Sequence, residues 1–206
     1  MKYYHFTYIL IIGFLLFVVY VLFTRNKDSE LQLQSQADVV LKMDGFYQFL
    51  KFKDKEIYIN NGAMLSPDLT LFDANGASVK LSEIIDDNTN TPKLIIRYSA
   101  MACDICLDEE LKIIQEFLAK LGKENIKILA SNHNVRSLIV KKNNLSIDLP
   151  IYRIEDTGIA FEKNHTNLFV FMIDKNYIVN DFFIPEKTMP ELSKDYYSAI
   201  IKKYSQ

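Results

Sequence analysis

Residues 93–106 read Lys-Leu-Ile-Ile-Arg-Tyr-Ser-Ala-Met-Ala-Cys-Asp-Ile-Cys, and this stretch decides the fold. Its first six residues are apolar at the centre and include two isoleucines, which is typical of a buried central strand. Its last four residues hold Cys103 and Cys106, the only cysteines of the chain. The stretch therefore predicts a central strand that is followed closely by a pair of thiols.

The residues after the cysteines repeat with the period of a helix. Apolar side chains recur at spacings of four and three until Gly122, and glycine commonly ends helices. The repeating residues are Leu107, Leu111, Ile114, Leu118 and Leu121. The pattern predicts a helix with one buried face, so that the two cysteines stand at a junction between a strand and a helix.

The rest of the pattern predicts an α/β domain with a mixed central sheet. Residues 69–81 read as two short strands around Asn75-Gly76, because that dipeptide tolerates the positive φ of a tight turn. Strands and helices then alternate as in a single α/β domain. The further predicted elements are strands at 126–131 and 150–154, a helix at 135–142, a strand hairpin at 168–173 and 177–184, and a helix at 190–204.

Length and composition limit the number of domains and the classes of function that the chain can have. A chain of 206 residues holds one domain of ordinary size and an extension, since single domains run to roughly 100–200 residues. The net charge is -2, and no basic stripe interleaved with aromatic residues is present, so nucleic acid is not an expected partner. Two cysteines are too few for a disulfide scaffold, and their close spacing suits redox or metal chemistry.

The amino-terminal region predicts a membrane anchor. Residues 6–23 carry no charge, and as a helix they extend over about 27 Å, close to the hydrocarbon thickness of a bilayer. The alternative is a cleaved signal peptide, but no small-x-small cleavage pattern follows Phe23. Lys2 on one side and Arg25 and Lys27 on the other leave the orientation open on charge alone.

These patterns divide the chain into three parts. Residues 1–25 form the membrane anchor, residues 26–60 a juxtamembrane linker or arm, and residues 61–206 the α/β domain. Within the linker, apolar residues between Phe46 and Ile59 suggest a strand or a hairpin arm before the domain proper.

The cysteine pair has the arrangement that thiol-disulfide exchange requires. A thiol at the start of a helix lies near unpaired amide groups and the positive end of the helix dipole, which stabilise its thiolate and lower its pKa. A second thiol one turn later can attack a mixed disulfide formed by the first. Nearby carboxylates oppose the effect and favour a reducing or mild pair; they belong to Asp104, Asp108, Glu109 and Glu110. The alternative is a pair of ordinary buried cysteines.

The stretch from Leu69 to Tyr204 resembles the thioredoxin superfamily, particularly the membrane-anchored redoxin-type proteins of bacteria. The resemblance lies in the strand, the Cys-x-x-Cys pair, the helix and the late strand hairpin in matching order. It implies a thioredoxin-like sheet flanked by helices, with Cys103 as the attacking thiol and Cys106 as the resolving thiol. It also implies a single-pass protein of the cytoplasmic membrane whose carboxyl-terminal domain is extracytoplasmic. Its partners would be a protein disulfide substrate and a thiol electron donor, and no cofactor is implied.

Two alternatives remain beside the oxidoreductase. The redoxin family has a proline facing the cysteines before the penultimate strand, whereas no proline occurs here between Pro150 and Pro185. The cysteine motif followed by His165 also resembles the Sco-type copper chaperones, in which two thiolates and an imidazole bind copper(I), a soft metal that suits these ligands. A non-catalytic binding module of the same fold is the third hypothesis. His133 is interpreted as a solvated loop residue.

Overall fold

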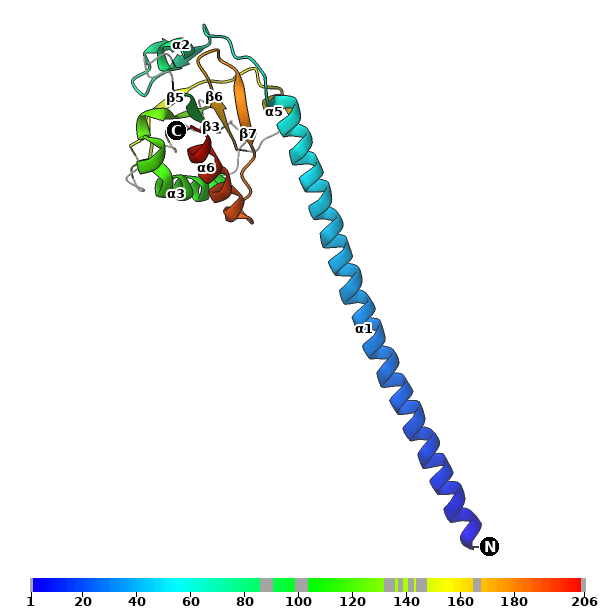
Figure 1. Cartoon of the computed structure of the whole chain (residues 1–206). Coiled ribbons are helices and arrows are strands. Elements are labelled where there is room, and N and C mark those ends of the chain that lie inside the picture. Colours follow the sequence, from blue (N-terminus) through cyan, green and yellow to red (C-terminus); the bar gives the residue numbers. More distant parts are fainter. Residues whose placement is uncertain are drawn as a thin grey trace. The chain divides into compact units, whose positions relative to one another are not determined.

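The computed structural model describes residues 2–85, 91–98, 104–131, 136, 139–140, 143, 148–164 and 168–204 (Figure 1). Within these ranges, the side chains of residues 2–12, 28, 30, 31, 104 and 164 lie outside the description. The chain divides into two compact units, Met1–Phe52 and Lys53–Gln206.

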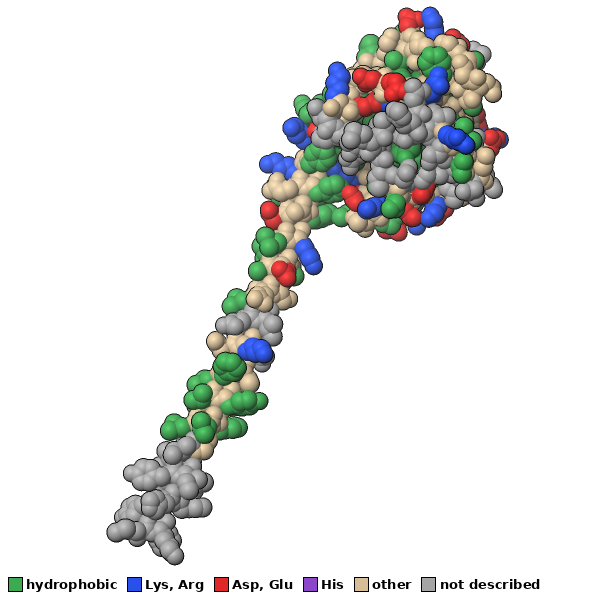
Figure 2. Space-filling view, turned by 180° about the vertical axis from the view of Figure 1, so that it is seen from behind, with side chains coloured by type: hydrophobic (Ala, Val, Ile, Leu, Met, Phe, Trp, Pro, Cys, Tyr) green, Lys and Arg blue, Asp and Glu red, His purple; other side chains and the backbone are tan. Residues whose placement is uncertain are grey.

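The first unit consists of one helix, α1, which covers Lys2–Asn60 and so continues into the second unit. Between Phe14 and Phe23 most of its large apolar side chains are exposed, and Figure 2 shows apolar side chains gathered along the helix. Within the part of the chain that the structure describes, no helix reaches both the length and the apolar character needed to cross a membrane. The first side chains of the predicted anchor 6–23 fall outside that part.

The strand or hairpin arm predicted between residues 46 and 59 is wrong, because this segment belongs to α1. Phe52 and Ile57 are an odd number of residues apart, so a strand would have placed them on opposite faces. The buried residues are instead Lys53, Glu56 and Asn60, which follow the spacing of a helix face. Because this inward face is polar, a search for apolar periodicity does not find it.

One mixed sheet organises the second unit. Among its described residues, seven strands lie in the order β2-β1-β5-β4-β3-β6-β7. The central strand β3 pairs in parallel with β4 and antiparallel with β6, and β4 pairs in parallel with β5. The strands are β1 (Thr70–Phe72), β2 (Ser78–Lys80), β3 (Lys93–Tyr98), β4 (Ile126–Ala130), β5 (Ile151–Arg153), β6 (Phe169–Ile173) and β7 (Val179–Phe183).

The helices agree with the sequence patterns where these were periodic. α3 covers Asp104–Leu121 and ends at Gly122, whose φ of 77° is the left-handed conformation that favours glycine. α6 covers Pro190–Tyr204, as predicted. The structure also contains the short helices α2 (Leu81–Ile85), η1 (Lys123–Asn125) and α5 (Ala160–Asn164). The predicted helix at 135–142 lies mostly outside the described residues.

The core lies on both sides of β3, all six residues of which are buried. Leu94, Ile96 and Tyr98 face the layer of α3 and α6, which contact each other. The opposite face of the sheet carries an aromatic cluster in which rings pack edge to face or stacked; its members are Phe161, Phe169, Phe171 and Phe182. Burial on both faces explains why β3 reads as an apolar run.

The last two turns of α1 are tied to this unit by hydrogen bonds. The side-chain oxygen of the fully buried Asn60 accepts the Phe161 N–H at 3.1 Å, and that of Asn61 accepts the Phe182 N–H at 2.9 Å. Residues 62–65 continue beside β7, where the Gly62 N–H donates to the Val179 carbonyl at 2.7 Å. The segment from Lys53 to Leu65 is therefore part of the fold.

We expect Asn60→Ala to lower the free energy of unfolding by about 1–3 kcal/mol, because it removes a buried hydrogen-bond acceptor. Urea denaturation measures the change. Gln48→Ala, at an exposed position of the same helix, serves as the control for helix propensity. Equal stability of the two variants would show that the hydrogen bond from Phe161 of α5 to Asn60 does not stabilise the fold.

Candidate functional site

The candidate site lies between the end of β3 and the start of α3. The Ser131 N–H donates to the Tyr98 carbonyl at 3.1 Å, so the ends of the parallel strands β3 and β4 are level at this edge. Cys106 is half-buried in the first turn of α3. Cys103 lies outside the described residues and directly precedes Asp104, where α3 begins.

The residues around Cys106 set its exposure. Ile105 is 61 % exposed, whereas Leu107 is fully buried against the sheet. Cys106 therefore sits at the boundary between the solvent-facing and core-facing sides of the first helical turn. Unpaired amide groups and the positive end of the helix dipole concentrate in this turn, and both favour a thiolate.

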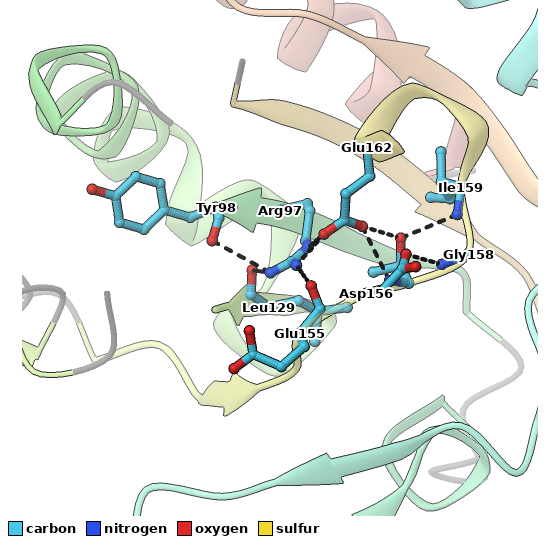
Figure 3. Close-up of polar contacts among 9 residues, drawn as sticks. Arg97, Tyr98, Leu129, Glu155, Asp156, Gly158, Ile159 and Glu162 are labelled. Atoms are coloured by element: carbon cyan, nitrogen blue, oxygen red, sulfur yellow. Dashed lines mark hydrogen bonds and ion pairs between the residues drawn. The ribbon is translucent and has the colours of Figure 1, made fainter. Parts of the chain in front are cut away.

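A buried arginine stabilises the edge of the sheet where β3 ends, before the cysteines in the sequence. Arg97 is the penultimate residue of β3, and its side chain is fully buried. Figure 3 shows its guanidinium among several acceptors. One nitrogen, Nη1, donates to the carbonyls of Tyr98 at 3.3 Å and Leu129 at 3.2 Å. Arg97 therefore holds the ends of β3 and β4 together.

The other nitrogens of Arg97 reach the segment after β5. Nε donates to a carboxylate oxygen of Glu162 at 2.8 Å, and Nη2 contacts the same oxygen and the Glu155 carbonyl, the latter at 2.9 Å. The second oxygen of Glu162 accepts the Thr157 hydroxyl at 2.6 Å and its N–H at 3.1 Å. All five N–H groups of the guanidinium thus have acceptors, which is what a buried arginine requires.

Comparisons with known proteins address the fold. Neither a family model nor a curated protein matches the sequence. Among solved structures, peroxidoxin BcpB from Mycobacterium tuberculosis superimposes with a TM-score of 0.52 at 17% identity, covering 70% of this chain and 97% of that one. The chain has a thioredoxin-like fold. This confirms the predicted mixed sheet flanked by helices.

Two further solved structures give lower scores. A putative thiol:disulfide interchange protein DsbE from Chlorobium tepidum has a TM-score of 0.48 at 14% identity, covering 69% of this chain and 99% of that one. A PrxQ mutant from Xylella fastidiosa has a TM-score of 0.48 at 13% identity, covering 69% and 95%.

Of the carboxylates predicted to repel a thiolate, Glu110 differs from the others in its surroundings. It lies one helical turn after Cys106, is 2 % exposed, and accepts hydrogen bonds from the hydroxyls of Tyr197 and of Ser193, the latter at 2.8 Å. Burial raises the pKa of Glu110, against the opposing effects of these hydroxyls and of Lys53. Glu110 is therefore bound to residues of α6, and its buried carboxyl group is harder to ionise than an exposed one.

Neither Arg97 nor Glu162 was singled out from the sequence. A charged residue near the end of an apolar central strand is a usable signal, because a buried charge requires a partner. The partner itself is 65 residues away, beyond the reach of any local pattern.

The histidines that the sequence analysis considered are His165, as a copper ligand, and His133, as a solvated loop residue. His165 and His133 lie outside the described residues, and among the residues that are described no group of three or more His, Cys, Asp or Glu side chains could hold a metal ion.

We expect Glu162→Gln to lower the free energy of unfolding by about 3 kcal/mol or more, because the charge of Arg97 then stays buried beside a neutral group. Urea denaturation measures the loss. Asp68→Asn is the control, since the Lys80–Asp68 pair is exposed and such pairs contribute about 1 kcal/mol or less. If both variants lose the same small amount, the ion pair does not secure this edge.

We also expect Glu110→Gln to reduce the pH dependence of stability. A carboxyl group whose pKa is raised in the folded state stabilises the fold at low pH, and this contribution is lost as the pH rises from the ordinary 4.5 through the raised value. The stability of the variant should therefore fall less than that of the wild type between pH 4 and about 7. Denaturation curves across this range, with the exposed Glu116→Gln as control, measure the difference. Parallel curves for all three proteins would contradict it.

Proposed function

We propose that this chain is a membrane-tethered thiol-disulfide oxidoreductase that reduces or exchanges disulfides of extracytoplasmic proteins through Cys103 and Cys106. One observation carries the proposal: Cys106 is half-exposed in the first turn of an 18-residue helix that follows the central strand of a thioredoxin-like sheet. A Cys-x-x-Cys pair at such a junction is suited to redox chemistry.

The reaction has two exchange steps. The Cys103 thiolate attacks a sulfur of the substrate disulfide, which forms a mixed disulfide and releases one substrate thiolate. The Cys106 thiolate then attacks the Cys103 sulfur, which releases the second substrate thiolate and leaves a Cys103–Cys106 disulfide. Two electrons have passed to the substrate, and a thiol donor restores the pair by the reverse exchange.

The tether is proposed from residues 6–23. This uncharged stretch lies within one uninterrupted helix, and most of its large side chains between Phe14 and Phe23 are exposed. An exposed apolar surface of this kind favours contact with lipid or with another protein. We place the protein in the cytoplasmic membrane as a single-pass protein with the carboxyl-terminal domain extracytoplasmic.

The copper(I) chaperone is the second candidate function, and the register between β3 and β6 supports it. Arg97 pairs with Phe169 in the antiparallel ladder of β3 and β6. The chain therefore enters β6 at the edge of the sheet where it leaves β3. Having these two strand ends at one edge supports a shared Cys/Cys/His site in the segments that adjoin them in sequence.

Insulin reduction by the full chain, with dithiothreitol as the thiol donor, tests the oxidoreductase. We expect Cys103→Ser to remove all detectable activity above the dithiothreitol background. Cys106→Ser that has been reduced and then freed of dithiothreitol should trap a mixed disulfide with insulin, visible on a non-reducing gel, because the resolving thiol is missing.

The outcomes separate the two candidates. Equal insulin reduction by the wild type and by Cys103→Ser would contradict the oxidoreductase. One-to-one copper(I) binding that His165→Ala abolishes, in a protein without insulin activity, would establish the chaperone instead.

A further inference from the structure

The sheet has a gap between β1 and β5. These antiparallel strands pair at one position, Phe72 with Arg153. Continued by two residues, the same register would set Thr70 opposite Glu155. A cavity of about 350 Å³ opens there instead, lined by Leu69, Thr70 and Phe72 on one side and by residues 153–156 on the other.

The hydrogen bonds of Ile154 and Glu155 explain why the pairing of β1 with β5 does not continue. The Ile154 N–H donates to the Ala130 carbonyl of β4 at 2.8 Å, and the Glu155 carbonyl accepts Nη2 of Arg97 at 2.9 Å. Both residues are therefore held toward the centre of the sheet, away from β1. Arg97 thus holds the segment just beyond β5 while it also binds the carbonyl of Tyr98, the last residue of β3.

The backbone of β1 leaves a strand edge at the cavity. The Leu69 carbonyl accepts the Leu81 N–H and the Asp73 N–H donates to the Ala77 carbonyl, so the odd-numbered residues of this strand face β2. Thr70 therefore turns its N–H and carbonyl toward the gap. An extended polypeptide can bind such an edge by main-chain hydrogen bonds, and its side chains then provide specificity.

The charges at the cavity favour a basic side chain. Glu155 and Asp156 are both exposed on the lining, whereas the guanidinium of Arg153 lies over the Phe72 ring, 4.6 Å from its centroid. The carboxylates thus outnumber the cations on the lining. The cavity also lies at the carboxyl end of β5. Because β3, β4 and β5 are parallel, the carboxyl end of β3, which precedes the cysteines in the sequence, lies at the same edge of the sheet.

We propose that the gap between β1 and β5 is a binding site for an extended segment of the polypeptide substrate that carries lysine or arginine. This inference rests on the proposed function, because it names the class of substrate that the two thiols receive. Thr70 supplies main-chain contacts, and Glu155 and Asp156 bind the basic side chain.

Peptide binding tests the proposal independently of redox activity. The full chain with Cys103→Ser and Cys106→Ser, in a non-ionic detergent at low salt, is titrated into fluorescein-labelled Thr-Val-Lys-Val-Lys-Val-Thr and into its counterpart with glutamate for lysine. We expect the lysine peptide to bind about tenfold more tightly, a preference that salt weakens. Adding Glu155→Gln and Asp156→Asn should abolish the preference.

Two further variants keep the test decisive. Glu191→Gln with Asp195→Asn removes the same charge from an exposed part of α6 and should leave the preference unchanged. Thr70→Trp fills the cavity from an exposed position without changing charge and should weaken binding of the lysine peptide about tenfold. Equal binding of the two peptides, the same loss in the α6 control, or wild-type binding by Thr70→Trp would overturn the proposal.

The insulin assay shows which idea has failed. Insulin reduction without a peptide preference would leave the oxidoreductase and remove the basic-segment site. A peptide preference in a chain without insulin reduction would remove the oxidoreductase, and the site would then belong to a binding module.

Discussion

A guanidinium inside a protein is stable only when its charge has a partner and its N–H groups have acceptors, and this requirement shapes the functional edge of the sheet. Arg97 stands at the end of β3 with its side chain fully buried. Its acceptors come from β3 itself, from β4, from Glu155 just beyond β5 and from α5. One side chain thus fixes four segments that are far apart in sequence.

That fixed edge matters for the proposed chemistry because the cysteines follow it in the sequence. Tyr98, whose carbonyl Arg97 binds, is the last residue of β3, and Cys103 stands between Tyr98 and Asp104 in the sequence. Leu107 and Leu111 fix α3 by full burial. Such rigid supports let a thiol keep its position at the start of a helix, where the dipole acts most strongly.

The sequence predicted the elements whose signals are local. β3, α3, α6 and both strand hairpins follow from apolar periodicity and from turn residues such as Asn75-Gly76. Residues 46–60 were misjudged because their buried face consists of Lys53, Glu56 and Asn60, and polar residues give no apolar pattern. The Arg97–Glu162 pair and the gap between β1 and β5 depend on contacts between distant segments. These two features could be identified only from the three-dimensional structure.

The proposed exchange chemistry depends on an acidic thiol at the amino terminus of α3, and the pH dependence of alkylation measures that property directly. In the full chain with Cys106→Ser, the rate at which iodoacetamide modifies Cys103 follows the thiolate fraction. We expect a midpoint clearly below about 8.5, the ordinary pKa of cysteine. A midpoint at or above that value would contradict it.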